Sequence, residues 1–549
     1  MTGVGTAVPR AASKVRQHTF KLRHARHISA PDRILLANGA AVRVAEVVPA
    51  LSPLAAQRRN LERVREALDI ARIPYFCVRG KAPNTSVVAV RESRRNDVLK
   101  AVRPACGQPP GYVAVLGSNA KTFAAAVPGF EAGVWNAAGR AGAVRVFWLQ
   151  ASDPAGRLVL GEDFGCEIEF WREEDGMLVA PRPNRVADEL PSDTGVADIV
   201  VGEEFLTNPW APHGAAGRPR PIPAAFDIPL PDDITFPVDA VYTWVDGGDA
   251  AWQARRDKAM ADAGGPALLS EQAANDARYL NRDELRYSLR SIDMYAPWIR
   301  TIYLVTDRQT PAWLDTDHPR VEVVDHRDIF TDPDALPTFN SHAIESQLHH
   351  IDGLAEHFLY FNDDVFLGRP VTPATFFHAN GLAKHFTSPS QVKLGPSGRD
   401  DAPVVAAGKN NRALISAAFA RVPVQKFKHA PHALLRSVLT EIEERFGAEH
   451  AATAGHRFRD PADISVTSSL HHNYAFLSGR SVPSDISFAY ADLAARHTPR
   501  RLNRFLEERA LDAFCLNDTE SELVSMNEQV SLLRWFLDAY FPVPADWER

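Results

Sequence analysis

The segment FLYFNDDVF at residues 358–366 places two consecutive carboxylates directly after a short apolar run rich in aromatic residues. Such a run predicts a strand that is buried on both faces of a sheet. In open α/β sheets, ligands bind in the crevice at the carboxyl ends of the strands, which is where Asp363 and Asp364 would lie. Carboxylate oxygens suit Mg²⁺ or Mn²⁺, and nucleotide phosphates can complete the coordination shell. The alternative is an Asn–Asp turn without function, and for this segment in isolation the turn is the better interpretation.

Further strands are predicted before this run. Residues 301–306 and 321–324 are short apolar segments of the kind that forms buried strands. Residues 238–249 predict another strand that runs into an acidic loop containing two glycines. Stretches with a helical spacing of apolar residues lie between these segments, and such alternation is typical of an α/β chain.

Two helices are predicted between these strands. Residues 281–284 carry an Asn at a helix N-cap position and a Glu three residues later, a variant of the capping box, and Pro297 closes the helix. A second helix is predicted from residue 341 to residue 351, with Glu345 and His349 on one face. Strands that alternate with helices imply a mostly parallel, Rossmann-like sheet, so we expect an α/β domain here.

Three segments precede this domain, which we place at residues 238–549. Residues 1–50 are basic and are predicted to be partly disordered, with a possible contact to anionic lipid as the alternative. Residues 51–206 combine helical and strand patterns and predict a smaller α+β domain. Residues 207–237 contain eight prolines and predict a stiff linker.

Composition excludes several classes of protein. The formal net charge of -7 argues against a nucleic-acid-binding protein. The four cysteines are widely scattered and form no CxxC pair, so neither a zinc knuckle nor a disulfide framework is expected. Reduced thiols are typical of a cytoplasmic protein. We find no apolar run long enough to span a membrane, so any membrane contact would be peripheral, at the inner face.

Four ordered blocks stand out from residue 238 onward. They read VDAVYTWVDGGD, RDELRYSLRSIDMYAPWIRTIYLVTDRQTPAWL, LPTFNSHAIESQLHHIDGLAEHFLYFNDDVFLG and, more loosely, HTPRRLNRFLEERALDAFCLND. These blocks, within residues 238–252, 275–330, 335–369 and 497–518, resemble those of the Stealth family. That family comprises bacterial capsular and exopolysaccharide sugar-phosphotransferases, together with the catalytic subunit of animal N-acetylglucosamine-1-phosphotransferase. The resemblance implies transfer of a sugar 1-phosphate from a nucleotide-diphosphate sugar to a hydroxyl, with release of a nucleoside monophosphate.

The resemblance also implies two acidic catalytic residues, Glu345 and Asp364. Asp364, together with Asp363, would hold Mg²⁺ or Mn²⁺ across the donor diphosphate. Glu345 would act either as a second metal ligand or as the base for the acceptor hydroxyl. The alternative for Glu345 is an exposed helix acid without a role in catalysis.

Two basic catalytic residues, His429 and Arg459, are implied in the same way. Arg459 suits bidentate phosphate binding, because its guanidinium is a fixed fork of donors. His429 would accept the hydroxyl proton or donate to phosphate. His432 and Arg457 lie close by in the sequence and are the alternatives to these two residues.

Five further residues are predicted to bind substrate. The loop after the first strand would approach the nucleotide through Asp246, Gly247 and Asp249, because a glycine permits close backbone contact. Arg286 would face phosphate, unless it merely flanks the core face of its helix. Asn362 directly precedes the two acids of the fourth predicted strand.

The sequence also leads to expectations about the acceptor, the donor and the alternative functions. The chain lacks the long insertions by which the animal enzyme recognises protein acceptors, so a growing glycan is the expected acceptor. The donor would be a nucleotide-diphosphate sugar such as UDP-GlcNAc. The first alternative is a metal-dependent nucleotide-sugar glycosyltransferase, which would release a nucleoside diphosphate. The second is a polysaccharide-binding protein without catalytic activity.

Overall fold

The computed structural model describes residues 32–38, 41–117, 120–201, 217–264, 279, 281–518 and 524–549. The chain divides into two compact units. One contains the residues up to Leu230 together with Asp538–Pro544, and the other contains Pro231–Leu537 together with Ala545–Arg549. The change from one unit to the other near residue 230 falls inside the expected Pro-rich linker.

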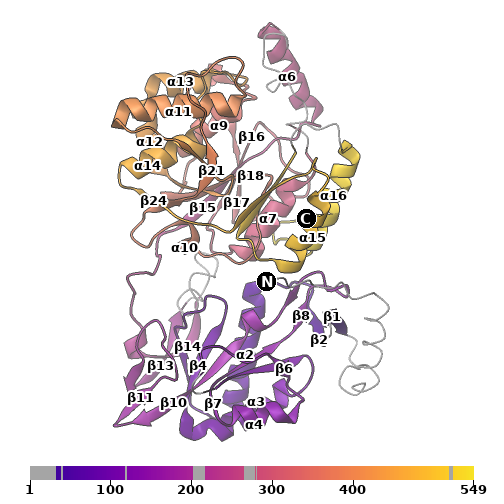
Figure 1. The fold of residues 1–549 in the computed structure, drawn as a ribbon, viewed down its shortest axis with the longest axis vertical. Coiled ribbons are helices and arrows are strands. Elements are labelled where there is room, and N and C mark those ends of the chain that lie inside the picture. Colours follow the sequence, from indigo (N-terminus) through magenta and orange to yellow (C-terminus); the bar gives the residue numbers. More distant parts are fainter. Residues whose placement is uncertain are drawn as a thin grey trace. The chain divides into compact units, whose positions relative to one another are not determined.

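A five-stranded sheet forms the centre of the second unit (Figure 1). The strand order is β17-β16-β15-β18-β23, in which the first four strands are parallel and β23 is antiparallel to β18. These strands are almost wholly apolar because helices and loops cover both faces of the sheet. The mostly parallel α/β architecture predicted from the sequence is therefore confirmed. The strands are β15 (Val238–Thr243), β16 (Ile302–Thr306), β17 (Val321–Asp325), β18 (His357–Asn362) and β23 (His432–Leu435).

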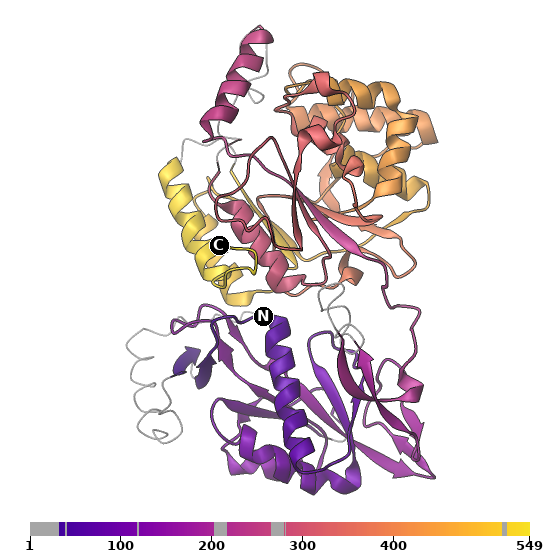
Figure 2. The same cartoon turned by 180° about the vertical axis from the view of Figure 1, so that it is seen from behind.

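Helices flank this sheet in two groups, which lie on opposite sides in both views (Figures 1 and 2). One group contains α9 (Ser341–Ser346), α11 (Pro403–Phe419), α12 (Arg436–Arg445), α13 (Gly447–Gly455) and α14 (His471–Leu477). The other contains α7 (Glu284–Tyr295), α15 (Thr498–Glu508) and α16 (Met526–Tyr540). The remaining helices of this unit are α6 (Ala250–Asp262), α8 (His326–Ile329) and α10 (Pro373–Phe376).

Two helices differ from their predicted form. The helix expected over residues 341–351 stops at Ser346 and continues as a separate 3-10 turn, η8, at Leu348–His350. Helix α7 begins at Glu284, and the preceding Asp283 is left-handed with φ of 67°. Asn281 accepts a hydrogen bond from the Asp283 N–H instead of capping the helix, so the capping box is not formed.

A small three-stranded sheet extends the end of β18. It has the order β19-β26-β25, and β19 begins immediately after Asp364. Its strands are β19 (Val365–Leu367), β25 (Phe488–Asp492) and β26 (Ala513–Asn517). The other pairs in this unit are β20 (Ala383–His385) with β24 (Ser481–Pro483), and β21 (Thr387–Gln391) with β22 (Gln425–Phe427).

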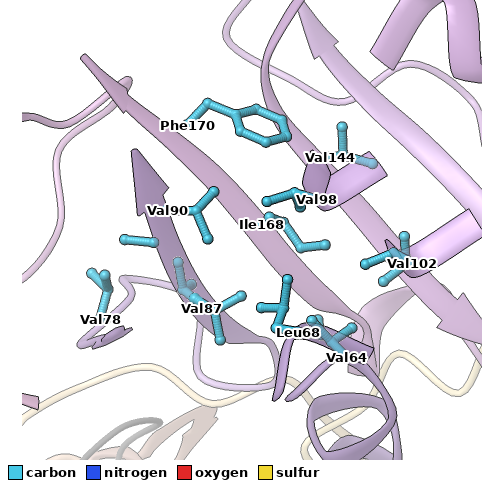
Figure 3. Packing of buried hydrophobic residues seen from close by; sticks show 14 of the residues in the cluster. Val64, Leu68, Val78, Val87, Val90, Val98, Val102, Val144, Ile168 and Phe170 are labelled. Carbon is cyan, nitrogen blue, oxygen red and sulfur yellow. The ribbon is translucent and has the colours of Figure 1, made fainter. Parts of the chain in front are cut away.

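The first unit is a separate mixed sheet with helices packed on it, which agrees with the predicted α+β character. Its core contains branched aliphatic side chains from β3, β4, β7, β10, α2 and α3 together with aromatic ones such as Phe170 (Figure 3). The helices are α2 (Pro53–Ile70), α3 (Arg95–Cys106) and α4 (Ala132–Ala138). The main strands are β3 (Phe76–Val78), β4 (Ser86–Arg91), β5 (Gly111–Gly117), β7 (Ala141–Trp148), β10 (Cys166–Glu174), β11 (Met177–Val179) and β12 (Glu189–Pro191).

Part of the segment expected to be disordered is a hairpin. Strands β1 (Arg33–Asn38) and β2 (Ala41–Val47) pair in antiparallel fashion, and Ala45 packs with apolar residues of β5 and β7. The folded first unit therefore begins before residue 51, where we expected it to start, because apolar side chains alternate with polar ones along this hairpin. Residues 1–31, which carry most of the basic side chains, lie outside the described residues.

The expected linker also contains a strand. Strand β14 (Arg218–Pro223) pairs with β13 (Val196–Val201), and Ile222 is fully buried. Prolines alternate along β14, so all of them can occupy positions whose nitrogen points away from the partner strand. Arg220 is buried and its Nη1 lies 2.7 Å from Glu62 Oε1. The linker prediction was wrong here because proline count alone does not separate a linker from an edge strand.

Two further findings bear on the predicted environment of the chain. None of the described helices is both long enough and apolar enough to cross a bilayer. All four cysteines are buried, and none of them forms a disulfide, as the sequence predicted.

Candidate active site

The two acids of the NDD segment form the turn between β18 and β19. The backbone N–H of Leu516 on β26 donates to the carbonyl oxygen of Asp364 at 3.0 Å, so the turn is held on the small sheet. Oδ2 of Asp364 accepts a hydrogen bond from Sγ of Cys515 at 3.3 Å. Oδ1 of Asp364 is buried and has no hydrogen-bond partner among the described residues. The Asp364 carboxylate is therefore fixed in place with one oxygen left to bind something else.

His429 lies beside this carboxylate. Strand β23 pairs with β18 so that His432 faces Tyr360, which brings the residues just before β23 to the carboxyl end of β18. Nε2 of His429 is 3.6 Å from Oδ1 of Asp364 and 3.2 Å from Nδ2 of Asn362. Burial disfavours the charged imidazole, but Asp364 and the neighbouring acids outweigh burial and raise the pKa of His429.

The alternative histidine, His432, occupies a different environment. Its Nδ1 lies 3.0 Å from Nε2 of His472 in the protein interior. Burial, reinforced by His429, lowers the pKa of His432 to about 3. His429, not His432, is therefore the histidine that reaches the paired acids.

Glu345 projects from α9 toward the same strand. The side chain of Asn340 caps this helix by accepting the N–H of His342 at 3.1 Å. Oε2 of Glu345 accepts a hydrogen bond from Oγ1 of Thr467 at 2.6 Å, and the residue is only 7% exposed. Burial, followed by the nearby Glu345 carboxylate, raises the pKa of Tyr360 on β18. Glu345 is thus not an exposed helix acid, which removes the alternative drawn from the sequence.

Arg459 contacts the first turn of α9. Its Nη2 donates to Oγ of Ser341 at 2.9 Å, and Ser341 lies one helical turn before Glu345. The competing Arg457 donates instead to the carbonyl oxygens of Asp334 and Leu336. Of the two arginines, Arg459 is the one placed beside the helix that carries Glu345.

An excess of carboxylates surrounds the end of β18. Arg282 pairs with Glu284 at 2.6 Å and with Asp518 at 3.1 Å. Burial, then the charges of Glu284 and Asp364, raise the pKa of Asp363 well above its usual range. Among the described residues, the carboxylates of Glu284, Asp363, Asp364 and Asp518 thus gather near one guanidinium, that of Arg282, and one imidazole, that of His429. A site with this charge balance favours the binding of a cation.

The donor atoms fit a hard divalent cation. Ligating atoms of Asp364, His429 and Cys515 all lie within 4.8 Å of one another. Burial, then Asp364, raise the pKa of Cys515 well above its usual range. Asp363 is not among these three residues, so Asp364 is the one that offers carboxylate oxygens, and a ligand role for Asp363 stays a prediction. Oxygen donors of this kind suit Mg²⁺ or Mn²⁺.

The acidic loop after β15 is held by contacts of its own. Asp249 caps α6 by accepting the N–H groups of Ala251 and Trp252 at 2.7 and 3.1 Å. The Trp252 N–H lowers the pKa of Asp249. The N–H of Gly247 donates to the carbonyl oxygen of Tyr279 at 2.8 Å. A Cβ added to Gly247 would lie only 2.3 Å from the same oxygen. In this structure Gly247 thus permits close approach of another backbone segment, and Asp249 acts as a helix cap.

Asp246 stabilises the same loop from within. Its carboxylate Oδ1 accepts the N–H of Gly248 at 2.9 Å. Its own N–H donates to Oε1 of Gln309 at 3.0 Å, and Gln309 donates back to the Asp246 carbonyl oxygen. Asp246 thus orders the loop through its own carboxylate and backbone, and its contact with substrate stays a prediction.

Arg286 forms an ion pair with a carboxylate far along the chain. Its Nε lies 2.5 Å from Oε2 of Glu548, and Nε of Arg290 lies 2.6 Å from Oε1 of the same carboxylate. The two arginines are one turn apart on α7, so both reach the buried Glu548 near the C-terminus. A distant segment thus supplies a counter-charge for Arg286, which favours the alternative of a structural role, and phosphate binding by Arg286 stays a prediction.

Sequence reasoning missed several residues around the site. Thr467 and Cys515 contact Glu345 and Asp364, respectively, from segments far along the chain, and no local pattern marks either residue. Arg282 lies in the polar segment 281–284, which predicts only a helix start, so its role beside the acids has no signal in the sequence.

Comparison with known proteins identifies the family. Models of the Stealth conserved regions 1, 2, 3 and 4 match residues 236–264, 278–385, 428–476 and 503–549, respectively. Region 2 contains Glu345 and Asp364, and it spans both the 275–330 block and the 335–369 block. Region 3 contains His429 and Arg459 and lies outside the four blocks quoted from the sequence. Region 4 begins later and extends further than our last block.

Whole-chain relatives agree with these regions. An exopolysaccharide phosphotransferase of Streptomyces coelicolor is 48% identical over 548 residues, covering 96% of this chain and 90% of the relative. The exopolysaccharide phosphotransferase CpsY of Mycobacterium tuberculosis is 35% identical over 516 residues, covering 92% and 91%. A crystal structure of the galactosyltransferase LgtC is 10% identical, covers 56% of this chain and 96% of its own, and has a TM-score of 0.29, which is too low to support a conclusion. This chain belongs to the Stealth family.

Proposed function

We propose that this protein transfers a sugar 1-phosphate from a nucleotide-diphosphate sugar to a hydroxyl of a glycan, as part of capsular polysaccharide or exopolysaccharide synthesis. The product is a phosphodiester, and a nucleoside monophosphate is released. The observation that carries the proposal is the approach of His429 to the unpartnered oxygen of Asp364, 3.6 Å apart, at the carboxyl end of a parallel strand. Membership of a family with relatives named exopolysaccharide phosphotransferases supports the same reaction.

A metal ion and the guanidinium of Arg459 would both supply positive charge to the donor diphosphate. Asp363 and Asp364 would bind Mg²⁺ or Mn²⁺, which supplies positive charge to the diphosphate oxygens when it is bound. Arg459 would bind the phosphate whose charge grows in the transition state, because its planar fork presents two parallel donors. The position of Arg459 beside α9 supports this role.

The chemical step forms one bond and breaks one. The acceptor hydroxyl loses its proton, its oxygen bonds to the β-phosphorus, and the bond from that phosphorus to the bridging oxygen breaks. The electron pair and the negative charge leave with the nucleoside monophosphate. Two groups are placed to take the proton, Glu345 and His429, and the other one then orients the acceptor or binds phosphate. The hydrogen bond from Thr467 orients the Glu345 carboxylate for either task.

The decisive experiment is product analysis. The purified full chain is incubated with Mg²⁺, a glycan acceptor and a panel of nucleotide sugars that includes UDP-GlcNAc, and the nucleotides released are separated by chromatography. A nucleoside monophosphate together with a phosphodiester-linked product is expected. Release of a nucleoside diphosphate would show that the protein is a glycosyltransferase instead, since paired acids at the end of a strand suit that class as well. Binding of glycan without turnover of any donor would indicate a binding protein.

We further propose that the reaction takes place in the cytoplasm, with a peripheral contact to the inner face of the cell membrane as the alternative to a freely dissolved protein. The four cysteines without disulfides support a reducing compartment. Fractionation of cells that express the full chain tests this location: recovery outside the cytoplasm would contradict it, and recovery with the inner membrane would favour the peripheral contact.

A further inference from the structure

A second cluster of potential metal ligands lies away from the paired acids and shares no residue with them. It consists of His349 and His350 on the 3-10 turn η8 and Glu443 on α12, and their ligating atoms lie within 4.8 Å of one another. Nε2 of His349 is 2.5 Å from Oε2 of Glu443, and Nε2 of His350 is 3.0 Å from the same oxygen. His450 on α13 approaches from the other side, with Nδ1 at 3.8 Å from Oε1.

Backbone carbonyl groups determine the tautomers of two of these histidines. Nδ1 of His350 lies 2.9 Å from the carbonyl oxygen of Ile329, and Nε2 of His450 lies 2.9 Å from that of Ser346. A carbonyl oxygen only accepts, so these two nitrogens carry the protons. In the neutral rings, the nitrogens that face Glu443 are then bare lone pairs.

This arrangement is unfavourable without a cation. Bare lone pairs from His350 and His450 would face a carboxylate, which has no proton to donate. A neutral His349 could donate from Nε2 to Glu443, but this would leave the other two histidines unchanged. His349 and His450 are nearly inaccessible, at 2% and 3% side-chain exposure, and a charged ring is costly to bury. Several protonated rings around one carboxylate are therefore disfavoured.

The pattern matches a transition-metal site. Histidines that bind metals commonly donate their second ring N–H to a backbone carbonyl, which fixes the ring and its tautomer. His350 and His450 both do so. Nδ1 of His349 is buried without a partner in the described part of the chain, so this ring has no competing contact to turn it away from Glu443. Imidazole and carboxylate donors in this number suit Zn²⁺.

We propose that His349, His350 and Glu443 bind a structural Zn²⁺ ion, with His450 as the fourth ligand. The ion joins η8 to α12 and α13. Because η8 follows α9 directly, and the Ser346 carbonyl at the end of α9 orients His450, the ion also holds the helix that carries Glu345. This site is independent of the Mg²⁺ or Mn²⁺ expected at Asp364, and of the reaction proposed above.

Metal analysis of the untagged full chain tests the proposal. After purification and extended dialysis, we expect about one equivalent of zinc per chain by inductively coupled plasma mass spectrometry. The variants His350→Ala and Glu443→Gln should lose this zinc. Glu444→Gln, an exposed neighbour on the same helix, is the matched control and should keep it. Asp364→Asn should also keep it, and loss of zinc in that variant would place the ion at β18 and overturn the proposal.

A second measurement uses the wild-type chain and therefore does not depend on whether the variants fold. The wild-type chain is stripped with a chelator and then titrated with Zn²⁺ or Co²⁺ while its melting temperature and visible absorption are recorded. A saturable rise in melting temperature and the absorption bands of tetrahedral cobalt are expected. If neither appears, and the dialysed chain holds no zinc, the cluster is a histidine–carboxylate ion pair and the proposal is wrong.

Discussion

His429 Nε2 lies 3.6 Å from Asp364 Oδ1, although the two residues belong to different strand ends and are far apart in the sequence. The antiparallel pairing of β23 with β18 produces this contact, because it sets His432 opposite Tyr360 and leaves His429 just beyond the strand. The same pairing buries His432 beside His472. A single register thus decides which histidine is available for chemistry.

Replacement of Asp364 tests the proposed metal site. We expect Asp364→Asn to lower nucleoside monophosphate release by roughly a hundred- to a thousand-fold, because the carboxylate is the fixed donor at the site. Circular dichroism should be unchanged. Asp400→Asn, at an exposed position, is the matched control and should retain activity. Full turnover of Asp364→Asn in excess chelator would contradict the assignment.

The phosphate-binding role of Arg459 can be separated from its charge. Arg459→Lys keeps the positive charge but removes the planar fork, so we expect a loss of roughly ten- to a thousand-fold in kcat/KM. Arg457→Lys is the comparison, since Arg457 contacts only carbonyl oxygens, and it should change kcat/KM less than about threefold. Equal effects of the two substitutions would place Arg459 outside the site.

Arg286 should affect stability and not chemistry. Arg286→Ala removes one of two partners of the buried Glu548, so we expect a loss of about 1 kcal/mol in the free energy of unfolding with kcat unchanged at a temperature where the variant is folded. Glu548→Ala leaves Arg286 and Arg290 without their shared carboxylate and should cost about 3 kcal/mol. Urea unfolding followed by fluorescence measures both. A fall in kcat with stability unchanged would restore Arg286 to the substrate site.

Gly247 should tolerate no side chain. The Cβ of Gly247→Ala would meet the Tyr279 carbonyl oxygen at 2.3 Å, so one backbone segment must move, at a cost of about 1–3 kcal/mol. Gly398→Ala is the control, because a Cβ there has no neighbour within 4 Å. Melting temperatures of the two variants should differ clearly. Equal melting temperatures would mean that the loop accommodates the change.

Asp463 predicts a pH dependence of stability. Hydrogen bonds from His342 and His456 outweigh burial and lower the pKa of Asp463 to about 2. Because the unfolded pKa is ~3.9, Asp463 stabilises the fold above pH ~4 by about 2 kcal/mol, and this contribution is lost as the pH falls toward 2. The stability difference between wild type and Asp463→Asn should shrink over that range.

Two comparisons make the pH experiment specific. Asp485→Asn, at an exposed position, should leave the unfolding free energy unchanged throughout. The hydrogen bond to Asp463 raises the pKa of His456 above its unfolded value of ~6.5. The stability that His456 contributes is therefore fully present below pH ~6.5 and is lost as the pH rises through the pKa of His456 in the folded protein. A constant difference between wild type and Asp463→Asn from pH 2 to pH 8 would contradict the network.

Local sequence determined the strands and the position of the acids. The short, aromatic-rich apolar run before Asn362 predicts a buried strand, which the structure confirms as β18, and Asp363 and Asp364 follow it directly. Their place at the carboxyl end of the sheet follows from the position of the run in the sequence. The Stealth blocks likewise contain Glu345 and Asp364, because these lie within continuous segments.

Only tertiary structure decided which charged groups meet. The sequence around Arg286 does not reveal whether phosphate or a carboxylate neutralises its charge. The carboxylate is that of Glu548, which lies next to the last residue of the sequence. The hydrogen bond from Thr467 to Glu345 and the three histidines around Glu443 depend on helix packing between distant segments. Charge pairing acts through space over a few ångströms, and a linear pattern does not encode those distances.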